Sequence, residues 1–337
     1  ISAIRPETWE EINRVLLSNA RQTKLEDGGV VRLDSTVTSA LMHEPSDSSL
    51  LWDAVRIMVR LLKQADALAG GAGLGEWRDH CRAAKKRARK IQFTRGRPNR
   101  VQLYRELIAI TRATLAYLRQ AAAQLAVASN PLVELWQAQL CHYRPLIERI
   151  IAQSERRVLA GELVPASDKL VSLFEPHADI IVKGSRDTEY GHKLNLTTGR
   201  SGMILDLVIE AGNPRDSDRL LPMLERHVAF YGRAPRQAAA DGGFASRDNL
   251  ATAKTLGVRD MAFHKKAGLR IEDMVRSNWV YRKLRNFRAG IEADISCLKR
   301  AYGLARCTWR GLDHFKSNVW SSIVAYNLVV FTRLRPT

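Results

Sequence analysis

The order of strand and helix patterns along the chain is the feature that most constrains its fold. Residues 30–38 alternate in polarity and are rich in β-branched side chains, so they predict a strand. Helical spacing then continues for roughly 110 residues, and strand patterns resume only from about residue 163. A strand separated from its sheet partners in this way predicts an α/β protein with a long all-helical insertion after the first strand.

The second half of the chain predicts a mixed sheet with helices on both faces. Short strands are expected at 170–174 and 179–182, and residues 192–198 and 203–209 flank the turn Gly199-Arg-Ser-Gly as the arms of a hairpin do. Helix and strand patterns then alternate, and terminal helices follow from about residue 272. A hairpin followed by β-α-β-α units is typical of an α/β domain.

The helical block contains long amphipathic segments, which are best interpreted as an antiparallel bundle or hairpin. We therefore expect residues 45–159 to form a helical insertion, and residues 29–44 with 160–337 to form one α/β domain. Residues 1–28 are interpreted as the remnant of an N-terminal helical region, because the chain opens on Ile1 rather than on Met.

The formal net charge of the chain is +18, which indicates a polyanionic partner. No window of the sequence resembles a membrane span, so nucleic acid is favoured over a membrane. The cysteines form no C-x-x-C pair and predict buried free thiols in a reducing cytoplasm. They are Cys81, Cys141, Cys297 and Cys307.

A basic run lies between the predicted helices of the insertion, and no acidic residue interrupts it from Arg82 to Arg105. Its centre is Lys85, Lys86 and Arg87. Such a run forms either a solvated face or a contact with DNA phosphates, and the net charge favours the DNA contact.

The stretch from Arg285 to Lys299 predicts a helix with one apolar stripe. Arg288, Glu292 and Lys299 lie together on a flank of that stripe. They form either a surface i,i+4 pair or a metal-binding carboxylate beside cations that bind phosphate. Other basic and aromatic residues near this helix, including Trp309, either contact DNA or belong to the core.

A metal-binding Glu292 requires partner acids at strand ends, and the sequence offers Asp34 and Asp241. Asp34 lies within the first predicted strand, and Asp241 follows a short strand and precedes Gly242 and Gly243. Two or three carboxylates suffice to hold Mg²⁺ ions for phosphodiester chemistry. The alternative for Asp241 is a simple Asp-Gly turn. The histidines at 177, 192 and 264 have no ligand spacing and are not expected to bind metal.

Several motifs together resemble bacterial insertion-sequence DDE transposases, most closely the ISNCY group. They are Leu-Asp34-Ser-Thr, His43-Glu-Pro-Ser-Asp-Ser-Ser-Leu-Leu-Trp-Asp, Glu189-Tyr-Gly-His-Lys-Leu-Asn-Leu, Ala240-Asp241-Gly-Gly-Phe-Ala-Ser and Asn286-Phe-Arg-Ala-Gly-Ile-Glu292. The related signature Y-x2-R-x3-E-x6-K is met at Arg288, Glu292 and Lys299, whereas its first position is Arg285 and a tyrosine, Tyr281, lies one turn earlier.

The resemblance implies an RNase H-like catalytic domain in which Asp34, Asp241 and Glu292 bind Mg²⁺, with Mn²⁺ as a substitute. It also implies cleavage and 3′-end strand transfer on double-stranded DNA, both element ends and target, by a homodimer on paired ends in the bacterial cytoplasm and nucleoid. Arg285, Arg288, Lys299, Trp309 and the insertion's Lys85, Lys86 and Arg87 are the expected DNA contacts. A metal-dependent nuclease on the same fold and a non-catalytic DNA-binding remnant are the alternatives.

Overall fold

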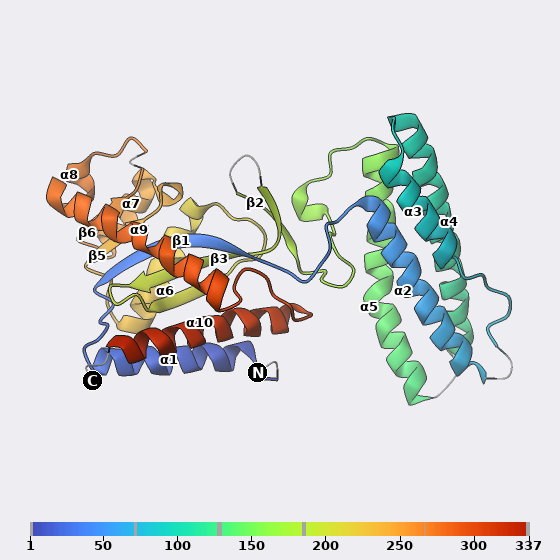
Figure 1. Ribbon diagram of the computed structural model, residues 1–337, viewed down its shortest axis with the longest axis horizontal. Helices are drawn as coiled ribbons and strands as arrows, with labels where there is room; N and C mark the ends of the chain where they lie inside the picture. The colour runs from blue at the N-terminus through green and yellow to red at the C-terminus, as the bar shows by residue number, and fades with distance from the viewer. Residues whose placement is uncertain (1–2, 71–72, 127–129, 184–186, 266, 335–337) are drawn as a thin grey trace. The chain divides into compact units, whose positions relative to one another are not determined.

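A computed structural model describes residues 3–70, 73–126, 130–183, 187–265 and 267–334. The chain forms two compact units (Figure 1). Unit 1 comprises Ile1–Leu41 and His177–Thr337, and unit 2 comprises Met42–Pro176. None of the helices in these described ranges is both long enough and apolar enough to cross a membrane.

Unit 1 is built on a mixed sheet, as the sequence predicts for the α/β class. In the described part of the chain the sheet has six strands: β1 (Val30–Ser39), β2 (Asp179–Lys183), β3 (Asp187–Gly199), β4 (Ile204–Ile209), β5 (Gln237–Ala240) and β6 (Asp260–Phe263). The long strand β3 pairs antiparallel with β1 on one edge and with β2 and β4 on the other. Strands β1, β5 and β6 are parallel.

The parallel register between β1 and β5 brings two distant segments level with each other. Val30 pairs with Gln237, and Leu33 pairs with Ala240. Asp34 and Asp241 are the next residues of these two segments, so the register places them side by side at the carboxyl end of β5.

Helices cover both faces of the sheet of unit 1 (Figure 1). They are α1 (Pro6–Gln22), α6 (Leu220–Tyr231), α7 (Arg247–Thr255), α8 (Ile271–Met274), α9 (Asn278–Ala301) and α10 (Leu312–Leu334). Asn327 of α10 is fully buried, and its amide bonds the Asn13 side chain of α1 at 2.7 Å and the backbone of Ile204 at 2.8 Å. One amide therefore ties both helices to the sheet, since a buried amide needs partners for its donors and acceptor.

Unit 2 is helical and consists of α2 (Asp47–Leu68), α3 (Cys81–Phe93), α4 (Arg97–Leu125) and α5 (Pro131–Ser154). Their apolar faces form one core, within which the indole N–H of Trp136 donates to the carbonyl of Leu61 at 2.9 Å. The basic run predicted to lie between helices forms α3 itself, because Ala84, Ala88 and Ile91 give it a buried face.

The cysteines were predicted to be buried. Cys307 of unit 1 is buried, whereas Cys141 of α5 is exposed, so the prediction was wrong for Cys141.

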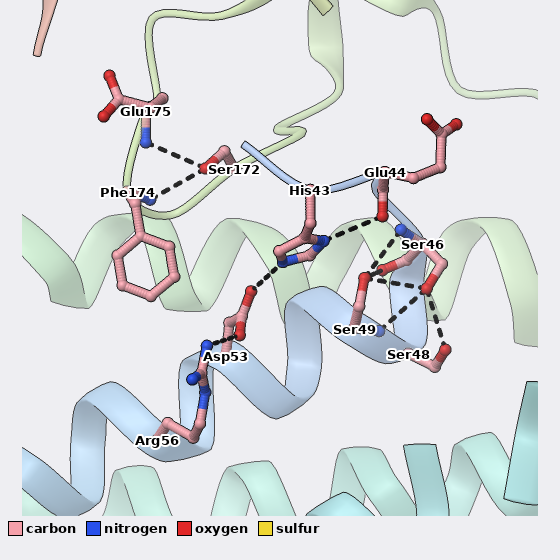
Figure 2. A network of polar contacts seen from close by, with 10 residues as sticks. All are labelled: His43, Glu44, Ser46, Ser48, Ser49, Asp53, Arg56, Ser172, Phe174 and Glu175. Carbon is pink, nitrogen blue, oxygen red and sulfur yellow. Dashed lines mark hydrogen bonds and ion pairs between the residues drawn. The ribbon is translucent and has the colours of Figure 1, made fainter. Parts of the chain in front are cut away.

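The chain enters unit 2 through a polar network at the first turns of α2 (Figure 2). Ser46 forms a capping box with Ser49, which satisfies backbone amides at the start of the helix. His43 bonds Asp53 through Nε2 at 2.8 Å and the Glu44 carbonyl through Nδ1 at 3.0 Å, and Asp53 also pairs with Arg56. The motif that starts at His43 is thus a helix start held by a buried carboxylate.

The expected strand at 170–174 is absent from the described structure, which is irregular there. Side chains occupy the backbone groups that a strand would use for pairing. The Leu170 amide donates to the Gln153 side chain at 2.8 Å, and Ser172 Oγ accepts from the amides of Phe174 and Glu175. Local side-chain bonds of this kind compete with sheet formation.

Candidate active site

Asp34 is positioned by the central strand of the sheet. Strand β1 lies between β3 and β5 and is buried along nearly its whole length. Asp34 itself is 8% exposed, and its Oδ1 accepts a hydrogen bond from the Ser35 amide at 2.8 Å. A carboxylate this deep requires compensating donors or cations.

Asp241 is the first residue after β5, and its side chain is 38% exposed. Glu292 lies in the middle of α9, with a side chain that is 65% exposed. The site therefore combines one buried, one half-buried and one solvent-facing carboxylate, supplied by two adjacent parallel strands and one helix.

A single guanidinium joins these carboxylates. Nη2 of Arg288 lies 2.8 Å from Asp34 Oδ2 and 3.3 Å from Asp241 Oδ1, and Nη1 lies 2.8 Å from Glu292 Oε1. The Arg288 side chain is only 9% exposed. Three acids that are far apart in the sequence thus converge on one cation, and the pairing of Arg288 with Glu292 is only part of this larger cluster.

The donor chemistry of this cluster suits a hard divalent cation, because carboxylate oxygens are the ligands that Mg²⁺ prefers. In the arrangement observed, Arg288 supplies the positive charge instead. Across the described ranges, no group of three or more His, Cys, Asp or Glu side chains is placed to hold a metal ion. The residues fit the metal by ligand type, and the guanidinium must turn away before the carboxylates can share an ion.

A second arginine, Arg32, fixes α9 against β1. Its Nε donates to Thr198 Oγ1 at 2.8 Å, its Nη1 to the Phe287 carbonyl at 2.8 Å and its Nη2 to Asp294 at 2.5 Å. It also stacks over the Phe287 ring. Because these contacts are made by the residue directly before Arg288 and by one nearly two turns after it, they hold that guanidinium level with Asp34.

Gly290 is required by this contact. A Cβ at position 290 would collide with the Arg32 guanidinium, which its three partners hold in place. Arg32, Asp294 and the reason for Gly290 were not predicted from the sequence. The signals that could have found them are an arginine inside a buried strand and a glycine inside a helix, where it is costly.

Burial raises the pKa of the Asp294 carboxyl even though Arg32 and the Tyr326 hydroxyl act in the opposite direction. The Tyr326 Oη donates to Asp294 Oδ1 at 3.1 Å. Burial, followed by the neighbouring Asp294 carboxylate, raises the pKa of Tyr326 in turn. Arg32, Asp294 and Tyr326, which hold α9 in place, therefore form a desolvated polar cluster. The cluster keeps one geometry because each of its members needs its hydrogen-bond partners.

Gly242 and Gly243 leave room for side chains of this chain. A Cβ at Gly242 would lie 2.8 Å from Lys265 Cβ, and one at Gly243 would lie 2.8 Å from Asp216 Oδ2. Asp216 pairs with the buried Lys193 at 2.6 Å. The two glycines thus bring a lysine and a further carboxylate close to Asp241.

The remaining predicted DNA contacts lie at several places. Arg285 is exposed on α9, one turn before Arg288, and Lys299 is partly exposed about two turns after Glu292. Trp309 is half-buried against the apolar cluster of α10. The Tyr281 hydroxyl donates to the Phe263 carbonyl at 3.0 Å, which fixes this tyrosine in the core.

The predicted contacts of the helical insertion lie on α3 of unit 2. Lys85 and Lys86 are exposed, and Lys85 Nζ lies 5.7 Å from the centroid of the Trp52 ring. Arg87 pairs with Glu106 of α4 at 2.8 Å. The face of α3 therefore carries exposed lysine charge, whereas the charge of Arg87 is partly compensated.

Residues 181–328 match a family model described as Transposase DDE domain. The matched range contains Asp241, Arg288 and Glu292, and it begins well after Asp34. Comparisons with curated proteins and with solved structures gave no match. Over this part of the chain the match indicates similarity to transposases of the DDE kind.

Proposed function

We propose that this chain is a metal-dependent DNA transposase of an insertion sequence in the ISNCY group, built on an RNase H-like fold. It cleaves DNA strands and transfers the freed 3′ ends to a target. The observation that carries the proposal is the convergence of Asp34, Asp241 and Glu292 on one guanidinium. Two of these acids lie in the matched family domain.

Asp34, Asp241 and Glu292 would hold Mg²⁺, or Mn²⁺ in its place. A bound ion at these residues would supply activation of water or of a 3′-hydroxyl and stabilisation of the charge that develops at the phosphate. Asp34 is kept oriented by the Ser35 amide, and Asp241 and Glu292 come from rigid elements on either side of it. Such fixed carboxylates need little reorganisation during the reaction.

Arg288 has two roles in this proposal. Without a ligand it pairs with all three carboxylates, and with DNA bound it turns to the phosphate that is to be attacked. A guanidinium suits both partners because its fork of N–H donors matches carboxylate and phosphate oxygens alike. Lys299, Arg285 and Trp309 would contact the flanking DNA.

The proposal extends to the partners of the chain. Lys85, Lys86 and Arg87 of α3 would contact DNA phosphates, and the protein would act as a homodimer on paired element ends, in the bacterial nucleoid.

The second candidate function is a DNA-binding protein without turnover. It is favoured by the ion pairs of Arg288 with all three carboxylates.

The test is metal-dependent cleavage and joining by the full-length protein, on DNA that carries the sequences flanking its own gene. Asp241→Asn removes a ligand charge and is expected to abolish both steps. Asp273→Asn is the matched control, because Asp273 is an exposed carboxylate paired only locally with Arg270. Equal activity of Asp241→Asn and the wild type would refute the proposal. Cleavage without joining would indicate a nuclease, and binding without cleavage would indicate the second candidate.

A further inference from the structure

A cationic cavity lies at the end of β5 opposite to Asp241. It has a volume of about 450 Å³ and includes Gln237 and Asp260, the first residues of β5 and β6. Five cations and one exposed aromatic ring dominate its lining: Arg200, Arg236, Arg259, Arg276, Lys283 and Trp279. A cavity of this volume accommodates a ligand of nucleotide size.

The cations come from separate elements that meet around the cavity. Arg200 belongs to the turn between β3 and β4, Arg236 and Arg259 directly precede β5 and β6, and Lys283 lies on α9. Arg276 lies just before α9, whose N-terminal end itself favours anions through its backbone amides and dipole. The fold thus gathers positive charge here from segments that are far apart in the sequence.

Most of this charge is left for an external anion. The one carboxylate of the lining, Asp260, is fully buried and already accepts from the Gln237 side chain at 2.8 Å and the Arg276 amide at 3.2 Å. Within the described ranges, the ion pairs among the lining residues are limited to Arg276 with Asp260, at 3.8 Å. Exposed cations that outnumber the acids around a cavity are the arrangement that binds phosphate.

Trp279 gives the cavity a surface for a base. Its side chain is 64% exposed, although a ring of this size is usually buried in a soluble domain. Lys283 lies one turn further along α9, with Nζ 5.0 Å from the centroid of the Trp279 ring. An aromatic ring beside cations suits a stacked base together with its phosphate.

We propose that this cavity binds one nucleotide of a single-stranded DNA segment. Its phosphate is held by the arginines at the starts of β5 and β6, and its base stacks on Trp279. Strand β5 separates the cavity from Asp241 by roughly 13 Å. That the strand is DNA rests on the proposed function, whereas recognition of a phosphate with a stacked base does not.

The probe is a 5′-phosphorylated thymidine dinucleotide, which is too short to occupy two sites. Its binding is measured by calorimetry at low salt in EDTA, where the carboxylate site plays no part. Trp279→Ala is expected to weaken binding by about 5- to 150-fold. Lys283→Gln and the double variant Arg236→Gln/Arg259→Gln are expected to lower the affinity for the dinucleotide further, until binding is no longer detected. Arg282→Gln is the matched control, because Arg282 is the exposed neighbour of Lys283 and lies outside the lining.

Wild-type affinity of Trp279→Ala, or an equal loss in Arg282→Gln and Lys283→Gln, would overturn the assignment of the cavity. Tighter binding of the matching ribodinucleotide would overturn the choice of DNA. The altered side chains are exposed, so the thermal unfolding of the variants should match that of the wild type. Trp279→Ala and Lys283→Gln test α9, whereas Arg236→Gln/Arg259→Gln tests the starts of β5 and β6. Asp241→Asn should bind the probe like the wild type, which separates this test from that of the carboxylate site.

Discussion

Replacement of Arg288 by methionine tests the carboxylate cluster most sharply. Methionine keeps most of the buried aliphatic volume and removes the charge that joins Asp34, Asp241 and Glu292. The Arg288 and Asp34 side chains are 9% and 12% exposed, so the variant leaves a buried carboxylate without its cation. Removing one partner of such a pair costs about 3–5 kcal/mol.

For a unit of about 200 residues, each kcal/mol lowers Tm by about 2–4 °C. We therefore expect Arg288→Met to unfold about 6–20 °C earlier than the wild type in EDTA, as measured by calorimetry. Glu292 contributes little to this loss because it is 65% exposed. Arg285→Met is the control: Arg285 is exposed one turn earlier on α9, so this change should alter stability by less than about 0.5 kcal/mol.

Magnesium adds a second measurement to the same variant. Without the guanidinium, the carboxylates can bind the ion. Mg²⁺ at 100 times its Kd would then raise the free energy of unfolding by about 2.7 kcal/mol. The wild type should gain less, because Arg288 competes with the metal for the same oxygens. The reasoning is refuted if Arg288→Met is as stable as Arg285→Met in EDTA, or if Mg²⁺ raises the Tm of all three proteins equally.

Two further predictions concern the anchor of α9 and the start of unit 2. Gly290→Ala should destabilise the protein by about 1–3 kcal/mol through its collision with Arg32, although the same change in an open helix stabilises by about 1 kcal/mol; a raised denaturation midpoint would contradict this. Burial lowers the pKa of His43, but the Glu44 carbonyl and Asp53 outweigh it, so the pKa lies above 6.5. The stabilisation from protonated His43 is therefore complete below pH 6.5 and is lost as pH rises through the raised pKa, by less than about 1 kcal/mol at this half-exposed site. His43→Gln should remove that difference in urea unfolding between pH 6 and pH 8, and exposed His142→Gln should keep it.

The strands that carry the acids could be predicted from the sequence because each has a local signal. Residues 30–38 show the pattern of a strand and form β1, and Asp241 ends a short apolar run that forms β5. The alignment of Asp34 with Asp241 could not be derived, because it depends on parallel pairing between segments about 200 residues apart. Hydrophobic periodicity indicates which face of a helix or strand is buried, but it does not identify the strand that pairs with it.

The contacts of Arg288 were predicted only in part. Helical spacing indicates its pair with Glu292, since residues four apart on a helix are neighbours. Its contacts with Asp34 and Asp241 depend on how deep α9 lies against the sheet, which Arg32 and Gly290 set. Such a depth is a property of tertiary packing, and Gly290 signals a close approach within this helix without identifying Arg32 as its partner.

The burial of the Trp309 ring could not be predicted from its neighbours in the sequence. Its basic neighbours suggested stacking on DNA, and the structure packs its ring partly against the apolar cluster of α10. Trp279 has similar neighbours and is exposed. Composition cannot separate these two outcomes, because an aromatic ring beside arginines suits a core edge and a nucleic-acid surface equally well.

The measurement that tests the central claim most directly is an anomalous difference map of the protein crystallised with Mn²⁺ and DNA. The account predicts manganese between the carboxylates of Asp34, Asp241 and Glu292, with ions about 3.5–4 Å apart and the Arg288 guanidinium turned to a phosphate. Manganese bound elsewhere, or carboxylates that still enclose Arg288 at saturating metal and DNA, would contradict it.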